Sequence, residues 1–286
     1  MPYRIPFQST GDEDSEDNFS SAQKKARKAK ARNTMNMAIL AGEIMLESGA
    51  ETYRVEDTII RLCKAIDIVN YVDVFVIPTG IFLTVGYDNN INTVLKRTKP
   101  KSVDLNKISL VNQFSRRFVT TNMTLDEAID YLSKLRGLKP YSDFVKSVLG
   151  GGLVGGFSAL LFGGSFPDFV SAFFVSLIVV KSREAVARKI NIISYVKDFL
   201  GSLVAGALAI LFVSLGIGAS VDKIIIGSIM PMVPGLAITN ATRDSISGDF
   251  LAGVSRASEA ILCALSIAFG VGVAIKYYTY FNIGGM

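Results

Sequence analysis

A short polar segment interrupts one of the most apolar regions of the sequence. The stretch PMVPGLAITNATRDSISGD, residues 231–249, lies between IIIGSIM and ILCALSIAFGVGVAI, and it contains two prolines, an arginine and two aspartates. Proline removes a backbone donor and disturbs the preceding turn, so we expect the helix to break here. Because irregular backbone within a membrane is tolerated only where it lines a cavity, the pattern predicts a polar binding site.

The residues after this break predict the side chains of the site. A helix that begins near Gly235 would carry its polar residues on one face, beside the positive end of its dipole. A guanidinium can bind a carboxylate through two parallel hydrogen bonds, and neighbouring hydroxyl and amide groups can orient it. The predicted substrate-binding residues are Pro234, Gly235, Thr239, Asn240, Arg243, Asp244 and Ser247.

Carboxylates near the break are the candidates for carrying a proton, because the sequence contains no histidine. They are Glu259, which lies just inside the following apolar run, Asp244 and Asp249. The plainer alternative is that Arg243, Asp244 and Asp249 are loop charges on the cytoplasmic side. We expect that alternative to hold for Asp249, and a functional role for Asn240 and Arg243.

Other chemistries find no support in the sequence. The two cysteines, Cys63 and Cys263, fall in different halves and form no CxxC pair, so we expect no metal site. No glycine-rich phosphate loop occurs, so we expect neither an ATPase nor a cofactor. A dense charged set could serve a membrane hydrolase, but capping and pairing along a helix explain it better. Its members are Glu43, Glu47, Glu51, Arg54, Glu56 and Asp57. We therefore predict that the protein is not an enzyme.

The first half of the chain has the composition of a soluble domain. Residues 1–33 combine the acidic stretch GDEDSED with the basic run KKARKAKAR, which predicts a disordered charged arm. The basic run could bind nucleic acid or an anionic membrane surface, but it has no interleaved aromatic residues, so we expect a solvated tail or the start of a helix and no nucleic-acid partner. Residues 34–140 show the periodicities of an α-α-β-β-β-α-α order, which predicts one small α+β domain with a three-stranded meander. Capping-box signatures occur at Ser48 with Glu51 and at Thr124 with Glu127.

The second half, residues 144–276, predicts a helical membrane domain. A spanning helix needs about 20 mostly apolar residues. Five stretches are expected to span: 144–163, 167–181, 199–218, 222–240 and 256–275. Basic residues gather in the loop 181–198 and are absent from the turn GGSFPD, which predicts a cytoplasmic N-terminus and an external tail at 277–286. Asp168 and Asp222 are expected to begin helices at the outer face.

The predicted fold class is therefore an α-helical integral membrane protein of about five transmembrane helices with an N-terminal cytoplasmic α+β domain. The expected location is the cell membrane, because the apolar stretches are long enough to cross a bilayer.

Three long motifs resemble the threonine/serine exporter family. They are AGEIMLESGAETYRVEDTI, VFVIPTGIFLTV and VPGLAITNATRDSISGDFLAGVSRASEA, and the resemblance runs from about Met35 to Tyr277. It implies a secondary transporter that exports small hydrophilic metabolites, threonine and serine in some members and dicarboxylates such as succinate in others. It also implies that the proton gradient drives export.

The resemblance also bears on the expected partners. Full-length members carry a second block of membrane helices, so this chain is similar to the larger subunit of the split, two-protein form. The implied partner is a small second membrane subunit, with a homo-oligomer as the alternative, besides a small-molecule substrate and the lipid bilayer. An alternative function is a membrane-anchored regulatory or sensor protein whose cytoplasmic domain binds a ligand or partner. The broken, charged fourth helix argues against it, since an anchor has no use for such a break.

Overall fold

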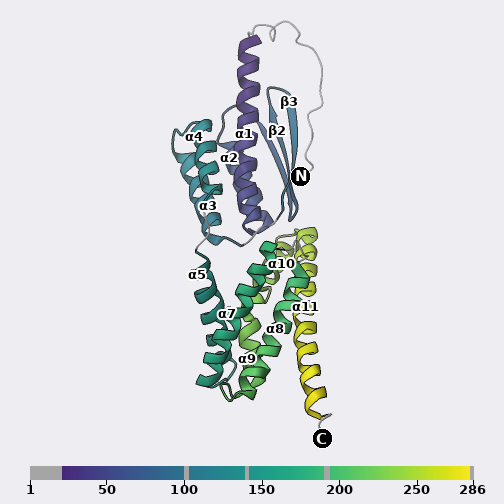
Figure 1. The fold of residues 1–286 in the computed structure, drawn as a ribbon. Helices are drawn as coiled ribbons and strands as arrows, with labels where there is room; N and C mark the ends of the chain where they lie inside the picture. The colour runs from purple at the N-terminus through teal and green to yellow at the C-terminus, as the bar shows by residue number, and fades with distance from the viewer. Residues whose placement is uncertain (1–20, 100–102, 139–141, 190–193, 284–286) are drawn as a thin grey trace. The chain divides into compact units, whose positions relative to one another are not determined.

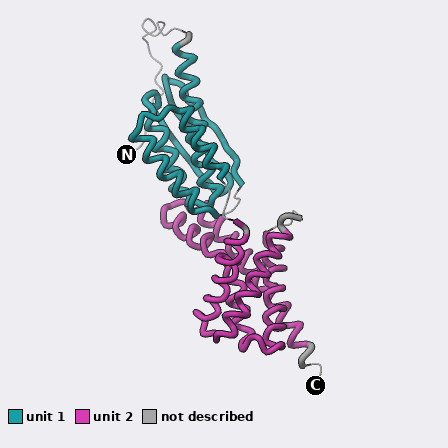
Figure 2. Tube along the Cα trace, turned by 60° about the vertical axis from the view of Figure 1, so that its left-hand side comes forward, with its two compact units in different colours: residues 1–138 teal, residues 139–286 magenta. Residues whose placement is uncertain are grey.

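The chain divides into two compact units, residues 1–138 and 139–286, which Figure 2 colours separately. A computed structural model describes residues 21–99, 103–138, 142–189 and 194–283. The predicted charged arm therefore lies outside the described residues up to residue 20, and so do the last three residues of the predicted tail. Because each unit has its own hydrophobic core, each is described by itself.

The first unit packs helices against a small antiparallel sheet (Figure 1). The strands β1 (Tyr71–Ile77), β2 (Gly80–Tyr87) and β3 (Asn90–Arg97) form a meander in the order β1-β2-β3. Asp88 and Asn89 join β2 to β3 with positive φ angles of 44° and 57°, which suits a tight hairpin turn. The helices are α1 (Ser21–Glu47), α2 (Thr52–Lys64), α3 (Leu105–Thr120) and α4 (Leu125–Arg136). The elements thus follow the order that the sequence periodicities predict.

The core of the first unit is built around α1. This helix contacts α2, α3, α4 and strand β2, and it buries Met37 and Ile44 almost completely. At Gly42 a Cβ atom would lie 2.6 Å from the Ile59 side chain and 3.1 Å from that of Ile81, so a larger residue would force these buried side chains to shift. The small residue therefore lets α1 approach both α2 and β2 closely.

Two local predictions for the first unit need correction. α1 begins at Ser21, so the basic run assigned to the charged arm is helical. Lysine, arginine and alanine are strong helix formers, which explains why the helix extends through this run. The expected capping box at Ser48 and Glu51 is wrong, because the N-cap Glu51 makes no side-chain cap hydrogen bond and pairs with Arg54 instead, at 3.2 Å. The capping box of Thr124 and Glu127 is confirmed.

The second unit is built from helices. They are α5 (Asp143–Val145), the π-helical η1 (Lys146–Leu153), α6 (Val154–Leu161), α7 (Phe166–Lys189), α8 (Ser194–Ser214), α9 (Val221–Ile229), the 3-10 turn η2 (Met230–Met232), α10 (Gly235–Ile246) and α11 (Phe250–Ile283). Within the described residues, α8 and α11 are long and apolar enough to cross a membrane, and the bent pair of α9–η2 with α10 is a third candidate. The apolar helix at 147–161 is shorter, and α7 ends in the charged stretch KSREAVARK. Two or three of the five expected spans thus have support, and the others stay predictions.

Glycines allow the helices of the second unit to pack closely. A Cβ at Gly155 would lie 2.4 Å from the Cβ of Ser176 in α7, and a Cβ at Gly227 would lie 2.5 Å from the Gly155 carbonyl oxygen. Such close backbone approach is typical of helices that associate in membranes. The backbones of α6, α7 and α9 therefore meet at these small residues.

A buried aspartate accepts hydrogen bonds from the loops that precede α7 and α9. Asp168 lies in the first turn of α7, where a helix N-terminal residue is expected, and its carboxylate accepts backbone N–H bonds from Ser165, Ala219 and Ser220, each at 2.8 Å. Asp222 lies in the first turn of α9. Hydrogen bonds of this kind satisfy the free amides of loop and helix starts, so Asp168 has a structural role.

Candidate functional site

The predicted break in the fourth apolar stretch is present. α9–η2 and α10 are bent by 56° with respect to each other, and α10 begins at Gly235 with Pro234 as its N-cap residue. Pro231 and Pro234 cannot donate backbone hydrogen bonds, which explains why the helical ladder stops between them. The hydroxyl of Thr239 donates to the Gly235 carbonyl at 2.9 Å, within the first turn of α10.

The helix after the break presents two faces of different character. Asn240 and Asp244, one turn apart, are buried, whereas Thr239, Arg243 and Ser247 are exposed along another side. The predicted site residues therefore do not form a single stripe. The structure brings Asn240 and Asp244 together against α11, which packs along α10, and it places the other three on the open side.

The buried face of α10 carries an ion pair with α11. An oxygen of Asp244 lies 2.9 Å from Nε of Arg256, with the carboxylate side chain fully buried and the arginine side chain 11% exposed. Two buried charges are stable only when they neutralise each other, so removing one side chain leaves the other charge buried without this counter-ion. Arg256 is not among the residues that the sequence predicted for the site.

A second cluster of polar side chains lies next to Met232, which is between the two prolines of the break. Arg183 of α7 forms an ion pair with Asp198 of α8, whose side chain is buried. The thiol of Cys263 in α11 donates to the other oxygen of Asp198 at 3.3 Å, and its sulfur lies 3.7 Å from the carbonyl oxygen of Met232 in η2. A buried carboxylate therefore lies where α7, α8 and α11 meet the end of the α9–η2 segment.

The three predicted proton carriers occupy different surroundings. Asp244 is buried and paired. Glu259 is exposed on α11, but it is an electrostatic neighbour of Tyr195 and Cys263, at the second cluster. Asp249 lies in the turn between α10 and α11, where its amide donates to the Asp244 carbonyl at 2.8 Å. Asp244 and Glu259 are thus placed near the buried charges, and Asp249 closes a helix end.

Sequence reasoning missed Asp198 and Arg183. Both belong to the stretch 181–198, of which only the basic residues were interpreted, as an indication of the cytoplasmic side. A signal was present, since Asp198 directly precedes the apolar run FLGSLVAGALAILF. An acidic residue inside an apolar helix is rare and is expected to face a partner in the bundle interior.

These two clusters define what the site can do chemically. Each holds a buried carboxylate against a guanidinium. The Asp198 cluster lies at the end of η2, next to the bend, whereas the Asp244 pair lies further along α10. A proton that neutralises such a carboxylate, or an anion that takes over its arginine, would weaken the pair. Among the described residues, no group of three or more His, Cys, Asp or Glu side chains is placed to hold a metal ion.

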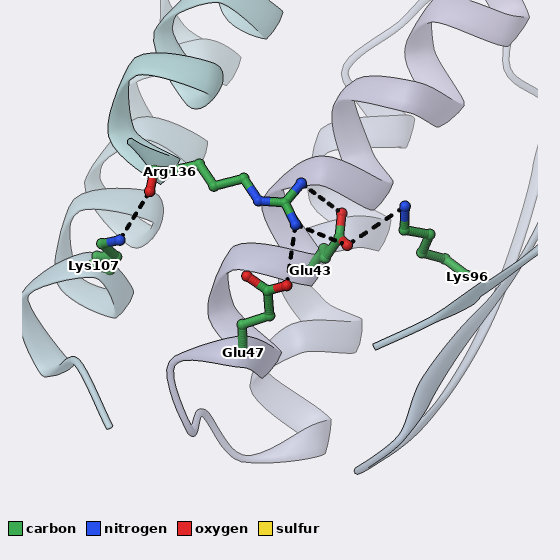
Figure 3. Close-up of polar contacts among 5 residues, drawn as sticks. All are labelled: Glu43, Glu47, Lys96, Lys107 and Arg136. Atoms are coloured by element: carbon green, nitrogen blue, oxygen red, sulfur yellow. Dashed lines mark hydrogen bonds and ion pairs between the residues drawn. The ribbon is translucent and has the colours of Figure 1, made fainter. Parts of the chain in front are cut away.

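The charged set of the first unit consists of structural pairs. Arg136 of α4 donates to both carboxylate oxygens of Glu43, at 3.1 and 3.2 Å, and to Glu47 at 3.1 Å (Figure 3). Glu56 accepts the backbone N–H of Val76 at 2.8 Å. Asp57 pairs with Arg61, four residues on, at 2.5 Å. These contacts favour the structural interpretation of the set over a hydrolase site.

Comparison with known proteins identifies the family to which the sequence is similar. The sequence profile of the threonine/serine exporter family, ThrE, matches residues 36–278. A threonine/serine exporter of Corynebacterium glutamicum is 23% identical over 248 residues, which cover 85% of this chain and 50% of that protein. An uncharacterised protein of Schizosaccharomyces pombe is 20% identical over 187 residues, covering 63% of this chain and 22% of that protein. The chain thus spans half of the first relative and less of the second. No solved structure matches the chain.

Proposed function

The chain belongs to the threonine/serine exporter family, and from this membership we propose that it is a subunit of a secondary transporter that exports small hydrophilic carboxylate metabolites. The expected substrates are threonine and serine or a dicarboxylate such as succinate. The observation that carries the proposal is the placement of two buried carboxylates, each paired with an arginine, on and beside a broken helix. Buried charge at membrane depth is costly and is retained mainly where it handles a substrate or an ion.

In this proposal the open side of α10 contacts the substrate. Arg243 binds the substrate carboxylate, and Thr239 and Ser247, on the same exposed side, contact its polar groups. The positive end of the α10 dipole at Pro234 and Gly235 adds to the attraction for an anion. Gly235 is exposed, and a Cβ atom there would meet nothing within 4 Å. Asn240, one turn further along and buried, orients the helix behind the site.

The buried pairs supply the coupling to protons in this proposal. A proton that neutralises Asp244 breaks its ion pair with Arg256 on the buried face of α10, and so weakens the contact between α10 and α11 behind the substrate side. Asp198 offers the same chemistry at the end of η2, where Arg183 is its counter-ion. Glu259 and Asp249 remain the alternative proton carriers, and Glu259 is favoured of the two because it neighbours the second cluster.

A second membrane subunit completes the transporter in this proposal. The C. glutamicum relative is about twice as long as the segment that matches this chain, since 248 matched residues make up 50% of it. A homo-oligomer of this chain is the alternative assembly. Large apolar side chains along α11, including Leu265 and Phe269, are exposed in the chain by itself and are suited to lipid or to a partner helix.

An anchored sensor is the competing function. Such a protein would need apolar spans to hold its first unit at the membrane, but it would gain nothing from buried ion pairs at a break in one span. The two functions are separated by asking whether a solute crosses the membrane.

The proposal is tested by efflux from cells loaded with labelled threonine or labelled succinate. Cells that express the chain together with its membrane partner should lose at least one of the two labels faster than cells with an empty vector. The matched control is the same chain with Arg243→Gln, which should be present in the membrane at the same level and should export more slowly. Equal loss of both labels in all three strains would remove the transporter assignment.

A further inference from the structure

A long basic groove runs along α1 in the first unit. Residues of α1 form its floor, β3 contributes one wall and α4 the other, and its volume is about 900 Å³. The charged residues that line it are Lys25, Lys28, Arg32, Lys96 and Arg136, against the single carboxylate of Glu43. The groove therefore attracts an anionic occupant, and its length along a helix suits a chain better than a compact molecule.

The cations at one end of the groove are neutralised within the unit. Glu43 is only 6% exposed and receives two hydrogen bonds from Arg136, at 3.1 and 3.2 Å. Lys96 of β3 lies 3.5 Å from the same carboxylate (Figure 3). The backbone oxygen of Arg136 in turn accepts a hydrogen bond from Lys107 at 2.9 Å. This end is a fixed, charge-balanced structure.

The cations at the other end are not neutralised in the described part of the chain. Lys25, Lys28 and Arg32 share one face of α1, since they are three and four residues apart, and they make no ion pair there. Two cations on another face of the same helix do have partners, because Arg27 pairs with Asp88 at 2.7 Å and Lys30 with Asp67 at 2.5 Å. Of the cations of α1 that make no ion pair in the described residues, Lys25, Lys28 and Arg32 thus line the groove, whereas Lys24 does not.

The chain itself contains a segment that fits this end in charge and in length. The stretch from Asp12 to Asp17, DEDSED, has five acidic residues in six and precedes α1 by three residues. The eleven steps from Lys25 to Asn36 of α1 rise about 17 Å. An extended chain covers about 3.3 Å per residue, so five or six residues fill that length. We propose that residues 12–17 bind in the groove as an extended acidic segment, antiparallel to α1 and beside the edge strand β3.

The short connection to α1 favours this occupant over an external one. Residues 18–20 can cover about 10 Å when extended, which is enough to reverse the chain and bring Asp17 beside Lys25. A segment tethered so closely has an effective concentration in the millimolar range, so a modest attraction is enough to keep it bound. The contact is electrostatic and exposed to solvent, so salt weakens it.

Disulfide cross-linking of the full chain in detergent tests the proposal. The pair Ser15→Cys with Ala29→Cys places one thiol in the acidic segment and one on the groove lining. The control pair Ser15→Cys with Gln23→Cys places the second thiol on the opposite side of α1, although Gln23 is closer in sequence. The native cysteines are buried, and burial raises the pKa of the Cys63 thiol to about 12, so they stay out of the reaction.

Under mild oxidation at low salt, the Ser15–Ala29 pair should cross-link at least tenfold faster than the Ser15–Gln23 pair. The triple change K25Q, K28Q and R32Q should remove this preference, and so should 1 M sodium chloride. The double change R27Q and K30Q, which neutralises the paired cations of the same helix, should leave it intact. Equal rates for the two pairs, or a preference that survives the triple change, would overturn the proposal and leave the groove to an external anion.

Discussion

The ion pair between Asp244 and Arg256 is the contact on which the proposed site depends most at the scale of single residues. Arg256→Gln leaves the fully buried Asp244 carboxylate without this partner, and the loss of one member of a buried pair costs about 3–5 kcal/mol. We therefore expect a lower midpoint of thermal unfolding in detergent. The double variant Asp244→Asn with Arg256→Gln removes both charges and should recover most of that loss.

Transport separates a functional pair from a structural one. If the pair carries the coupling, the double variant folds but no longer responds to a proton gradient. A double variant that is as unstable as the single one would show that the two residues do not act as a pair. A double variant that is stable and exports like the parent would show that the pair serves structure alone.

Arg243 lies on the open side of α10, and its guanidinium can donate two parallel hydrogen bonds to a carboxylate. Arg243→Lys keeps the charge and loses this geometry. Loss of a charge-assisted hydrogen bond weakens binding by about 1.5–3 kcal/mol, which is roughly a ten- to hundred-fold change. We expect export at limiting substrate to fall by that factor while the amount of protein in the membrane is unchanged. Parent-like export by both Arg243→Lys and Arg243→Gln would move the site elsewhere.

At the scale of elements, the sequence predicted a helix or strand well where residues at its own ends, such as proline, glycine or turn residues, determine where it begins and stops. The meander of β1, β2 and β3 follows from alternating residues and turn signals, and Pro234 with Gly235 marks the start of α10 to the residue. The basic run before residue 34 could not be assigned from the sequence to the charged arm or to the start of a helix, and the structure shows that α1 begins at Ser21, as the helix preference of Lys, Arg and Ala favours.

Contacts between elements were much harder to predict than the elements themselves. Asp198 pairs with Arg183, fifteen residues away on another helix, and Cys263 reaches the same carboxylate from a third. No spacing rule along one helix links these residues, since helical neighbours are three or four residues apart. Asn240 and Arg243 were expected on one face, but burial against α11 selects Asn240 and leaves Arg243 exposed.

The capping box at the start of α4 gives a prediction for a single element. The hydroxyl of Thr124 accepts the amide of Glu127 at 3.3 Å, and the Glu127 carboxylate accepts the amide of Thr124 at 2.9 Å. Thr124→Ala should destabilise the first turn by about 1 kcal/mol, seen as faster hydrogen exchange of the Glu127 amide. Thr121→Ala, outside the box, is the matched control and should leave that amide unchanged. Equal exchange in both variants would show that the box adds no stability.

The same box predicts a response to acid. The hydrogen bond from the Thr124 amide holds the pKa of Glu127 below its ordinary value. The contribution of the carboxylate is therefore present above that ordinary value and is lost as the pH falls through the lowered one. Protection of the amides at the start of α4, taken relative to the intrinsic exchange rate at each pH, should fall in this acidic range in the parent protein, and it should fall less in a Glu127→Gln variant.

At the scale of the whole molecule, the distribution of basic residues predicts how the chain crosses the membrane. Lys181 and Arg183 lie in the last turns of α7 and Lys197 in the first turn of α8, whereas the turn 163–166 has no charge. Basic loops stay in the cytoplasm, so a reporter fused after Met286 should be extracytoplasmic. The control is a reporter fused at residue 138, which should be cytoplasmic. Cytoplasmic signal from both fusions would mean that the number of spans is even.

We propose that the chain moves carboxylate metabolites across a membrane through the polar region at the break of its α9–α10 pair. The most direct measurement is efflux of labelled threonine and succinate from proteoliposomes that hold the chain and its membrane partner, with and without a pH gradient. We predict that at least one label leaves faster when the gradient is imposed, and that the stable double variant Asp244→Asn with Arg256→Gln abolishes the effect. Efflux no faster than from empty liposomes, or a double variant that responds like the parent, would contradict the account.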